Sequence, residues 1–242
     1  QKHMNRLVYI LLIFVVFGGC KKDDETSPAT TDELQLQLKF TNDGVPLQFD
    51  TIMFANAGGY TSSFSRLQFY VSSVQLIKAD SSLVKISDYN YVDARVASTQ
   101  QLKFTLPATG HFIGMKLLLG LDSAHNISNS LPATVENINM AWPDMMGGGY
   151  HFMKLEGSYV DSTGTYGYAM HVGKNAYLVN CTISHHFDLN AGLNAKELVM
   201  NVNEWFKNPA IYDFNVDGNY SMGVMAAMTK LKNNGTDIFT IQ

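Results

Sequence analysis

The sequence predicts a mainly β protein, an antiparallel β-sandwich-like single domain with one or two short helices near the C-terminus. Three observations support this fold class. Residues 34–40 alternate strictly between apolar and polar side chains, the pattern of a strand with one buried face. Short apolar runs recur along the chain between turn residues, which favours a sandwich or a barrel. Apolar residues make up 46% of the chain, enough for a sizeable core.

The remaining strands follow from the same reasoning. Asn42-Asp43-Gly44 is a turn signal, so a return strand is expected over residues 47–53. In the apolar pattern of residues 67–76 the phase shifts at Ser72-Ser73, which predicts a β-bulge. Further strands are expected at residues 101–106, 112–121, 150–159, 166–172, 178–189 and 197–202, and residues 112–121 are apolar enough to be buried on both faces.

One hairpin and two helices complete the predicted fold. Asp161-Ser162-Thr163-Gly164 joins two apolar runs and predicts a hairpin. Asn203 is expected to cap a short helix carrying Trp205 and Phe206. Residues 221–232 form the best helical segment. Its expected apolar face comprises Val224, Met225, Met228 and Leu231, and Asn233-Asn234-Gly235 ends it.

The N-terminal residues predict export. Positive charges at Lys2 and Arg6 precede an apolar run at residues 7–17. This run is shorter than the roughly 20 residues that a membrane-spanning helix needs, and its flanks are those of a secretory signal. We therefore expect a signal peptide over residues 1–19.

The end of this segment predicts a lipid anchor. Residues 17–20, Phe-Gly-Gly-Cys, resemble the lipobox of bacterial lipoproteins, which implies that Cys20 becomes the acylated first residue. Residues 20–33 are polar and predict a flexible tether, which leaves residues 34–242 for the folded domain. The expected location is the outer membrane, on its periplasmic face or at the cell surface, with the lipid anchor as the membrane contact.

Composition and motifs exclude several function classes. The net charge of −4 gives no basic surface for nucleic acid. With Cys20 acylated, Cys181 is the remaining thiol, so no internal disulfide is expected. The chain has neither a nucleophile elbow nor a His-Glu-x-x-His motif, and we do not expect an enzyme.

Three stretches of the chain resemble the MbnP-like family of exported copper-binding proteins. They are residues 119–126 (LGLDSAHN), residues 139–142 with 149–157 (NMAW and GYHFMKLEG), and residues 170–173 (MHVG). Residues 69–76 fit the same family. The resemblance implies a β-sandwich-like domain, an envelope location, and copper bound by histidine with an oxidised tryptophan nearby. It implies no catalytic activity, and it leaves open a redox partner protein that modifies Trp142.

The candidate metal ligands are His171, His151 and His125, with Trp142 beside them. Imidazole suits copper and zinc. By strand alternation His151 shares a face with Met153 and Leu155, so it meets His171 only if register and face permit. Each histidine could equally be structural: a half-buried strand residue at 151 and 171, or a turn residue at 125.

Other residues have plainer interpretations. Trp142 is either a copper-proximal indole or, the interpretation we favour, an aromatic anchor for the glycine-rich loop after it. His185 and His186 are adjacent on a strand and should point to opposite faces, which makes a poor chelating pair. His111 is expected in a loop. Glu156 is expected to pair with a base such as Lys154 or Lys174.

Two functional hypotheses therefore stand. The first is an envelope lipoprotein that binds a transition metal, in the first instance copper. The second is a surface interaction module for a protein or glycan partner, motivated by the absence of a Trp-x-His pair and by the aromatic residues Tyr60, Tyr89 and Tyr91. An envelope enzyme is the least supported, because no acid–base constellation accompanies the lone acidic residues.

Overall fold

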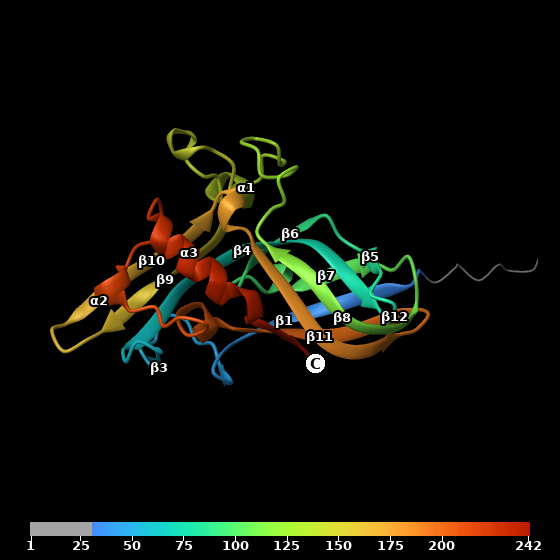
Figure 1. Cartoon of the computed structure of the whole chain (residues 1–242), viewed down its shortest axis with the longest axis horizontal. Coiled ribbons are helices and arrows are strands. Elements are labelled where there is room, and N and C mark those ends of the chain that lie inside the picture. Colours follow the sequence, from blue (N-terminus) through green and yellow to red (C-terminus); the bar gives the residue numbers. More distant parts are fainter. Residues whose placement is uncertain (1–30) are drawn as a thin grey trace, which may run out of the picture.

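Two β-sheets lie against each other in a computed structural model that describes residues 31–242 (Figure 1). In the first sheet the strands run in the order β13 (Phe239–Ile241), β12 (Leu193–Asn201), β1 (Glu33–Asn42) and β2 (Val45–Pro46), with β7 (Gln101–Thr105) paired to β1. In the second sheet the order is β10 (Thr165–Gly173), β9 (His151–Val160), β4 (Thr61–Lys78), β8 (Gly110–Leu119) and β11 (Val179–Leu189). The short strands β3 (Phe54–Ala55), β5 (Leu83–Lys85) and β6 (Tyr89–Asp93) pair with β4.

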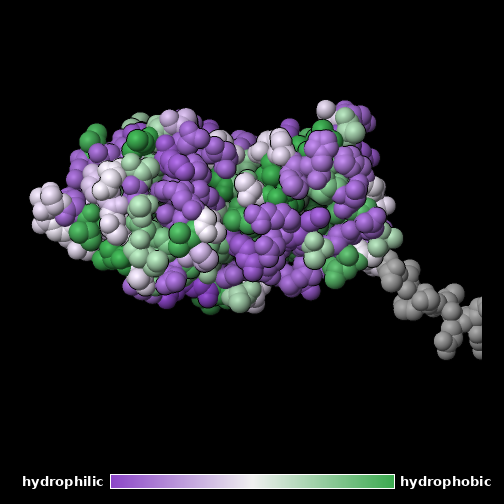
Figure 2. All heavy atoms as spheres, turned by 90° about the horizontal axis from the view of Figure 1, so that it is seen from below, coloured by the Kyte–Doolittle hydropathy of each residue, from purple (hydrophilic) through white to green (hydrophobic). Residues whose placement is uncertain are grey.

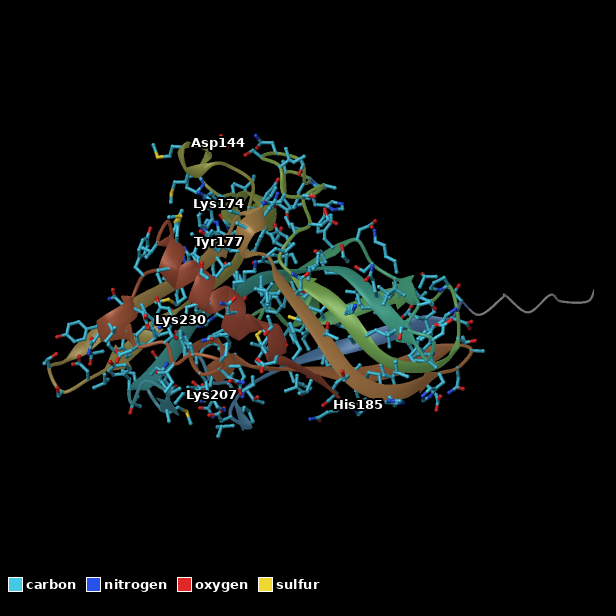
Figure 3. The ribbon with its side chains drawn as sticks, viewed as in Figure 1. Asp144, Lys174, Tyr177, His185, Lys207 and Lys230 are labelled. Atoms are coloured by element: carbon cyan, nitrogen blue, oxygen red, sulfur yellow. The ribbon has the colours of Figure 1, made fainter. Side chains whose placement is uncertain are left out.

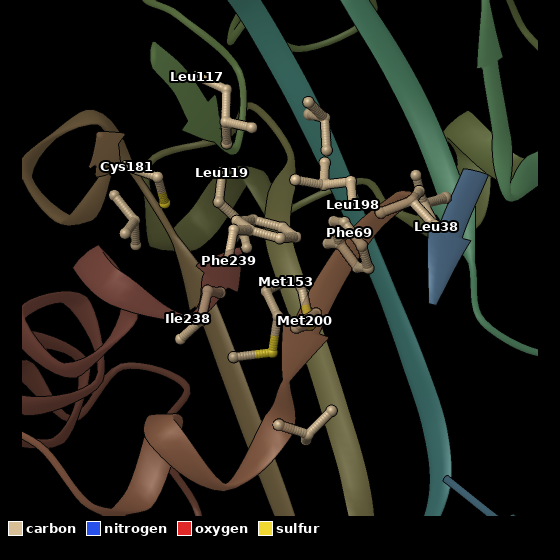
Figure 4. Packing of buried hydrophobic residues seen from close by; sticks show 14 of the residues in the cluster. Leu38, Phe69, Leu117, Leu119, Met153, Cys181, Leu198, Met200, Ile238 and Phe239 are labelled. Atoms are coloured by element: carbon tan, nitrogen blue, oxygen red, sulfur yellow. The ribbon is translucent and has the colours of Figure 1, made fainter. Parts of the chain in front are cut away.

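The core lies between the two sheets. The alternation of β1 buries Leu34, Leu36 and Leu38 at no more than 1% exposure, as the sequence predicts. They join a cluster to which β4 contributes Phe69 and β12 contributes Met200 (Figure 4). Burying one such side chain contributes about 1.5–3 kcal/mol relative to leaving it exposed, so this contact between the sheets stabilises the fold.

The mainly β, sandwich-like prediction is confirmed, with one difference in strand direction. β1 pairs with β7 in the antiparallel sense but with β12 in the parallel sense, Leu38 lying opposite Leu198. Antiparallel pairing was expected throughout. Alternation looks the same for either direction, so the sequence could not reveal the parallel pair.

The predicted bulge and hairpin are both present. The register between β4 and β8 shifts between Ser72 and Gln75, and Ser73 has a positive φ of 50°. β9 and β10 form an antiparallel hairpin, in which Asp161 accepts hydrogen bonds from Thr163 and Gly164 in the turn. The position of this hairpin determines the geometry of the candidate site.

Two local predictions are wrong. Residues 47–53 do not form a strand; they make single contacts such as the Phe49–Phe64 bridge. The short 3₁₀ helix Val202–Phe206 is capped by Asn201, whose side chain accepts from the backbone N–H of Asn203. Asn203 instead lies within this helix and bonds to Asp43 at 2.7 Å.

The C-terminal helix α3 (Met225–Asn234) also differs from the prediction. It buries Ala227, Met228, Leu231 and Asn234. Met225, expected on the apolar face, is 71% exposed. Asn234 is fully buried because its side-chain amide donates to the carbonyls of Trp205 and Ala210, a tertiary requirement that helical periodicity does not contain.

A second, smaller apolar cluster holds the segment that follows β8. It consists of Tyr70, Leu121, Leu131, Met140, Tyr150 and Phe152. Within it the hydroxyl of Tyr70 donates to Asn137 of helix α1 (Val135–Asn139) at 2.7 Å. The hydroxyl of Tyr150 accepts from the backbone N–H of Leu131 at 3.1 Å. These bonds fix the loop that carries Trp142.

The predicted signal peptide, Cys20 and most of the tether lie outside the described residues. The first strand begins at Glu33, one residue before the predicted start. Among residues 31–242, no helix is long and apolar enough to cross a membrane. On the face seen in Figure 2, hydrophobic residues form scattered patches between hydrophilic ones.

Candidate metal site

A register shift in the β9–β10 hairpin brings His151 and His171 onto one face. His171 lies opposite Lys154 and Val172 opposite Met153, but Gly173 lies opposite His151. One step along β10 therefore corresponds to two steps along β9. Because opposed residues share a face, the bulge moves His151 from the face of Met153 to that of His171. The expectation that His151 shares a face with Met153 and Leu155 is thus wrong.

The two imidazole rings are neighbours. Their centroids are 5.1 Å apart and their planes are nearly perpendicular, at 87°. His151 is 4% exposed, and the His171 side chain is 14% exposed. The structure therefore brings together two of the three histidines that the sequence selects.

His151 is held as a neutral imidazole. Its Nδ1 lies 3.1 Å from the carbonyl oxygen of Met140, which can only accept, so Nδ1–H donates and Nε2 keeps its lone pair. Burial lowers the pKa of His151 to about 3, with Lys154 adding to the effect. The ring is therefore uncharged at neutral pH, the form in which imidazole binds metals.

His171 is oriented by a carboxylate. Its Nε2 lies 2.8 Å from Oε1 of Glu156, which also accepts from Arg66 at 2.8 Å. The hydrogen bond from His171 lowers the pKa of Glu156 and Arg66 contributes further, against the opposing effect of burial. Glu156 is thus a carboxylate, Nε2–H donates to it, and the lone pair of His171 is on Nδ1.

The Nδ1 atom of His171 is buried and has no hydrogen-bond partner. Such an atom costs free energy unless something binds to it. The backbone around it is also fixed: Ser221 Oγ accepts from the N–H of His171 and donates to its carbonyl, both at 2.7 Å. The ring therefore presents an unused lone pair on a rigid edge strand.

Trp142 lies directly against His151. Their ring centroids are 4.7 Å apart, and the indole is 2% exposed. Gly173 leaves the space that the indole needs, because a Cβ there would be 2.4 Å from it. The indole Nε1–H donates to the carbonyl of Met146 at 3.3 Å, which ties down the loop. Trp142 is therefore both a loop anchor and a neighbour of the histidine pair.

His125 occupies a separate place. Its Nδ1 lies 2.8 Å from Oδ1 of Asp122, and its ring packs against Tyr89 at 5.3 Å. The same carboxylate accepts from the backbone N–H of His125 at 3.1 Å. These contacts make His125 a residue that closes the turn after β8, the alternative that the sequence left open.

Comparison with known proteins agrees with this architecture. A family model described as MbnP matches residues 31–226. The chain belongs to the MbnP family. Its fold is similar to that of MbnP from Methylosinus trichosporium, with a TM-score of 0.54 at 13% sequence identity, over 87% of this chain and 98% of that chain. No curated protein matches this chain in sequence.

The side chains of this MbnP family member supply only part of a metal-binding site. Both imidazoles show the arrangement typical of metal ligands, in which one ring nitrogen donates to a carbonyl or carboxylate and the other is free. Across residues 31–242, however, no three His, Cys, Asp or Glu side chains converge on a point that could hold a metal ion. The site therefore offers two nitrogen donors, a set suited to copper or zinc.

The sequence predicted other partners for Glu156 and did not identify two further residues that shape this site. Glu156 pairs with His171 and Arg66 rather than with Lys154 or Lys174, and neither Arg66 nor Ser221 was singled out. They come from β9, β4 and the segment before α3, so only strand register brings them together. Lys154 instead donates to the carbonyl of Asn139.

A pocket of about 350 Å³ opens beside Trp142. Its lining includes Leu131, Asn137, Trp142, Asp144 and Tyr150. The methionines of this loop do not close it over the histidines: Met145 is 94% exposed, and the methyl group of Met146 packs against Gly223. The loop therefore supplies an indole and a pocket but no thioether aimed at the imidazoles.

Proposed function

We propose that this chain is an envelope lipoprotein, anchored through Cys20 to the outer membrane on its periplasmic face or at the cell surface, that binds copper through His151 and His171. The observation that carries the proposal is the buried, unpartnered Nδ1 of His171 beside the neutral ring of His151. Each of these rings already has its other nitrogen engaged, so Nε2 of His151 and Nδ1 of His171 are the nitrogens left to bind a metal.

Copper supplies Lewis-acid and redox chemistry when it is bound. The residues of the chain hold and orient the donors: Met140 fixes His151, and Glu156 fixes His171. Trp142 covers His151 on one side. That a redox partner oxidises Trp142 stays an expectation from family resemblance; an intact mass that matches unmodified tryptophan in native material would remove it.

The test is copper content by ICP-MS after incubation with Cu(II) and with ascorbate-reduced copper, then removal of free metal. We expect about one copper ion per chain, since the two imidazoles form one site. The His171→Ala variant should lose it, and Glu156→Gln should bind about 10- to 100-fold more weakly.

His125→Ala is the matched control, because this histidine bonds to Asp122 at a separate place and its loss should leave the copper bound. Circular dichroism should show all three variants folded. A copper content in a folded His171→Ala variant equal to that of the parent would refute the proposal.

The hypothesis of an interaction module for a protein or glycan partner now depends on other residues than the three tyrosines expected from the sequence. Tyr60, Tyr89 and Tyr91 are half-buried: Tyr60 packs against Tyr159, and the other two pack against Tyr70. The exposed apolar side chains lie elsewhere, and include Ile127, Val135, Ile138 and Met145. Charged replacements at Val135 and Ile138 that abolish binding to whole cells or to a partner, with copper content unchanged, would favour this second function.

A further inference from the structure

Three polar side chains gather at the far end of the β8–β11 ladder. Asp188 of β11 lies directly opposite His111 of β8 in the antiparallel register, and His186 is two residues before Asp188. All three are exposed. The β11 strand begins at Val179 beside Tyr177 and Lys174, whereas His185 lies at the lower right of the molecule (Figure 3). The cluster is therefore remote from the His151–His171 pair.

A second register shift creates this cluster. The pairing of β11 with β8 slips between Ser184 and Phe187. Strict alternation already places His186 on the same face as Asp188. The slip brings His111 opposite Asp188, and so onto the face of His186, and it leaves His185 exposed as well. Beneath them Phe112 and Phe187 stack with their centroids 6.1 Å apart, which makes the platform rigid. His111 itself lies in the strand, not in the predicted loop.

The two ring nitrogens of the pair face each other. Nε2 of His111 lies 3.1 Å from Nδ1 of His186, and the ring centroids are 5.3 Å apart. Nδ1 of His111 lies 2.9 Å from Oδ1 of Asp188. A carboxylate accepts, so this Nδ1–H donates and the lone pair of His111 points at His186. If His186 carries its proton on Nε2, two lone pairs are aimed at each other.

The spacing of these nitrogens suits a shared metal. Two imidazole nitrogens bound to one ion at about 2.0–2.1 Å, with an angle near 90–109° between the bonds, are about 2.8–3.4 Å apart. The observed 3.1 Å lies inside that interval. The carboxylate on the outer nitrogen of His111 is the partner that metal-binding histidines typically have.

We propose that His111 and His186 form a second metal site, a bidentate imidazole pair oriented by Asp188, for a divalent transition metal. Imidazole donors favour Cu²⁺, Ni²⁺ and Zn²⁺, and among these Cu²⁺ binds most tightly. Because the cluster is exposed, water completes the coordination sphere and the metal exchanges readily with solution. The site is independent of the proposed function, because it shares no residue with the His151–His171 pair.

The experiment titrates Cu²⁺ into the full chain, kept in mild detergent because of the apolar run at residues 7–17. Isothermal calorimetry gives the number of binding events, and electron paramagnetic resonance detects nitrogen coordination. The same titration on His111→Ala/His186→Ala and on His171→Ala separates the two sites. The matched control is His185→Ala, the adjacent exposed histidine outside the pair.

The proposal predicts a Cu²⁺ binding event that survives in His171→Ala and His185→Ala but is absent from His111→Ala/His186→Ala. Asp188→Asn should weaken it about 10- to 100-fold. His111, His185, His186 and Asp188 are all exposed, so substitutions at these four positions should keep the parent's melting temperature in the absence of metal. If the parent shows no such event, or if the double variant binds as the parent does, the pair is only a cross-strand hydrogen bond and the proposal is overturned. Failure of His171→Ala to change copper content would refute the proposed function alone.

Discussion

The packing of the Trp142 indole against Gly173 can be tested by a single substitution. Gly173 lies opposite His151 at the end of β10, and the indole of Trp142 covers its Cα. A Cβ at residue 173 would be 2.4, 2.7 and 3.1 Å from three atoms of the indole. Its φ is not in the left-handed region, so the backbone itself accepts alanine. The Gly173→Ala substitution therefore acts through one contact.

The indole has little room to withdraw. His151 lies 4.7 Å away between centroids, and Nε1 of Trp142 is bonded to Met146. Inserting a methyl group into such a packed site costs about 1–3 kcal/mol. For a chain of this size 1 kcal/mol lowers the melting temperature by about 2–4 °C, so the expected decrease is about 2–12 °C. Copper affinity should fall as well, because the displaced indole presses on His151.

The assay combines thermal unfolding by circular dichroism with NMR of the indole N–H groups. Two such signals are expected, from Trp142 and Trp205, and only that of Trp142 should move. Gly167→Ala on the same strand is the control, because its new Cβ would meet only the carbonyl oxygen of Gly157 at 3.8 Å. It should stay within about 0.5 kcal/mol of the parent. Equal melting temperatures for the two variants, with an unmoved Trp142 signal, would refute the packing described here.

Three further measurements test other parts of the structure. Hydrogen bonds in the hairpin turn lower the pKa of Asp161 to about 2. The contribution of Asp161 to stability is therefore full above the pKa of the unfolded chain, near 3.8, and is lost as the pH falls through about 2. A carboxyl titration by NMR that gives an ordinary pKa for Asp161 would contradict this. Tyr70→Phe removes the donor to the buried Asn137 and should cost about 1–3 kcal/mol in urea unfolding, whereas a neutral effect would mean that the bond does not hold α1. Burial raises the pKa of Cys181 to about 12, so in a Cys20→Ser chain a thiol reagent should react only after unfolding, and rapid reaction of the native protein would show the thiol to be accessible.

Much of the fold could be predicted because strand periodicity is a local property. The alternation of residues 34–40 determines which side chains of β1 are buried, whatever strand lies beside it. The Asp161–Gly164 turn is specified by its own hydrogen bonds, so the hairpin carrying both histidines could be predicted too. What the sequence could not show was the parallel neighbour of β1, since both pairing directions bury the same face.

The arrangement of the candidate site could not be predicted from local sequence patterns. The composition and motifs of the chain by themselves determined its fold class, the strands that carry His151 and His171, and the expectation of an exported, anchored protein. Only the tertiary structure decided that a slip of one residue opposite Gly173 turns His151 toward His171, and that a slip between β11 and β8 brings His111 onto the face of His186. A bulge changes which residues of two paired strands lie on the same face. For that reason the sequence named the histidines, but the arrangement of the sheet determined which of them meet.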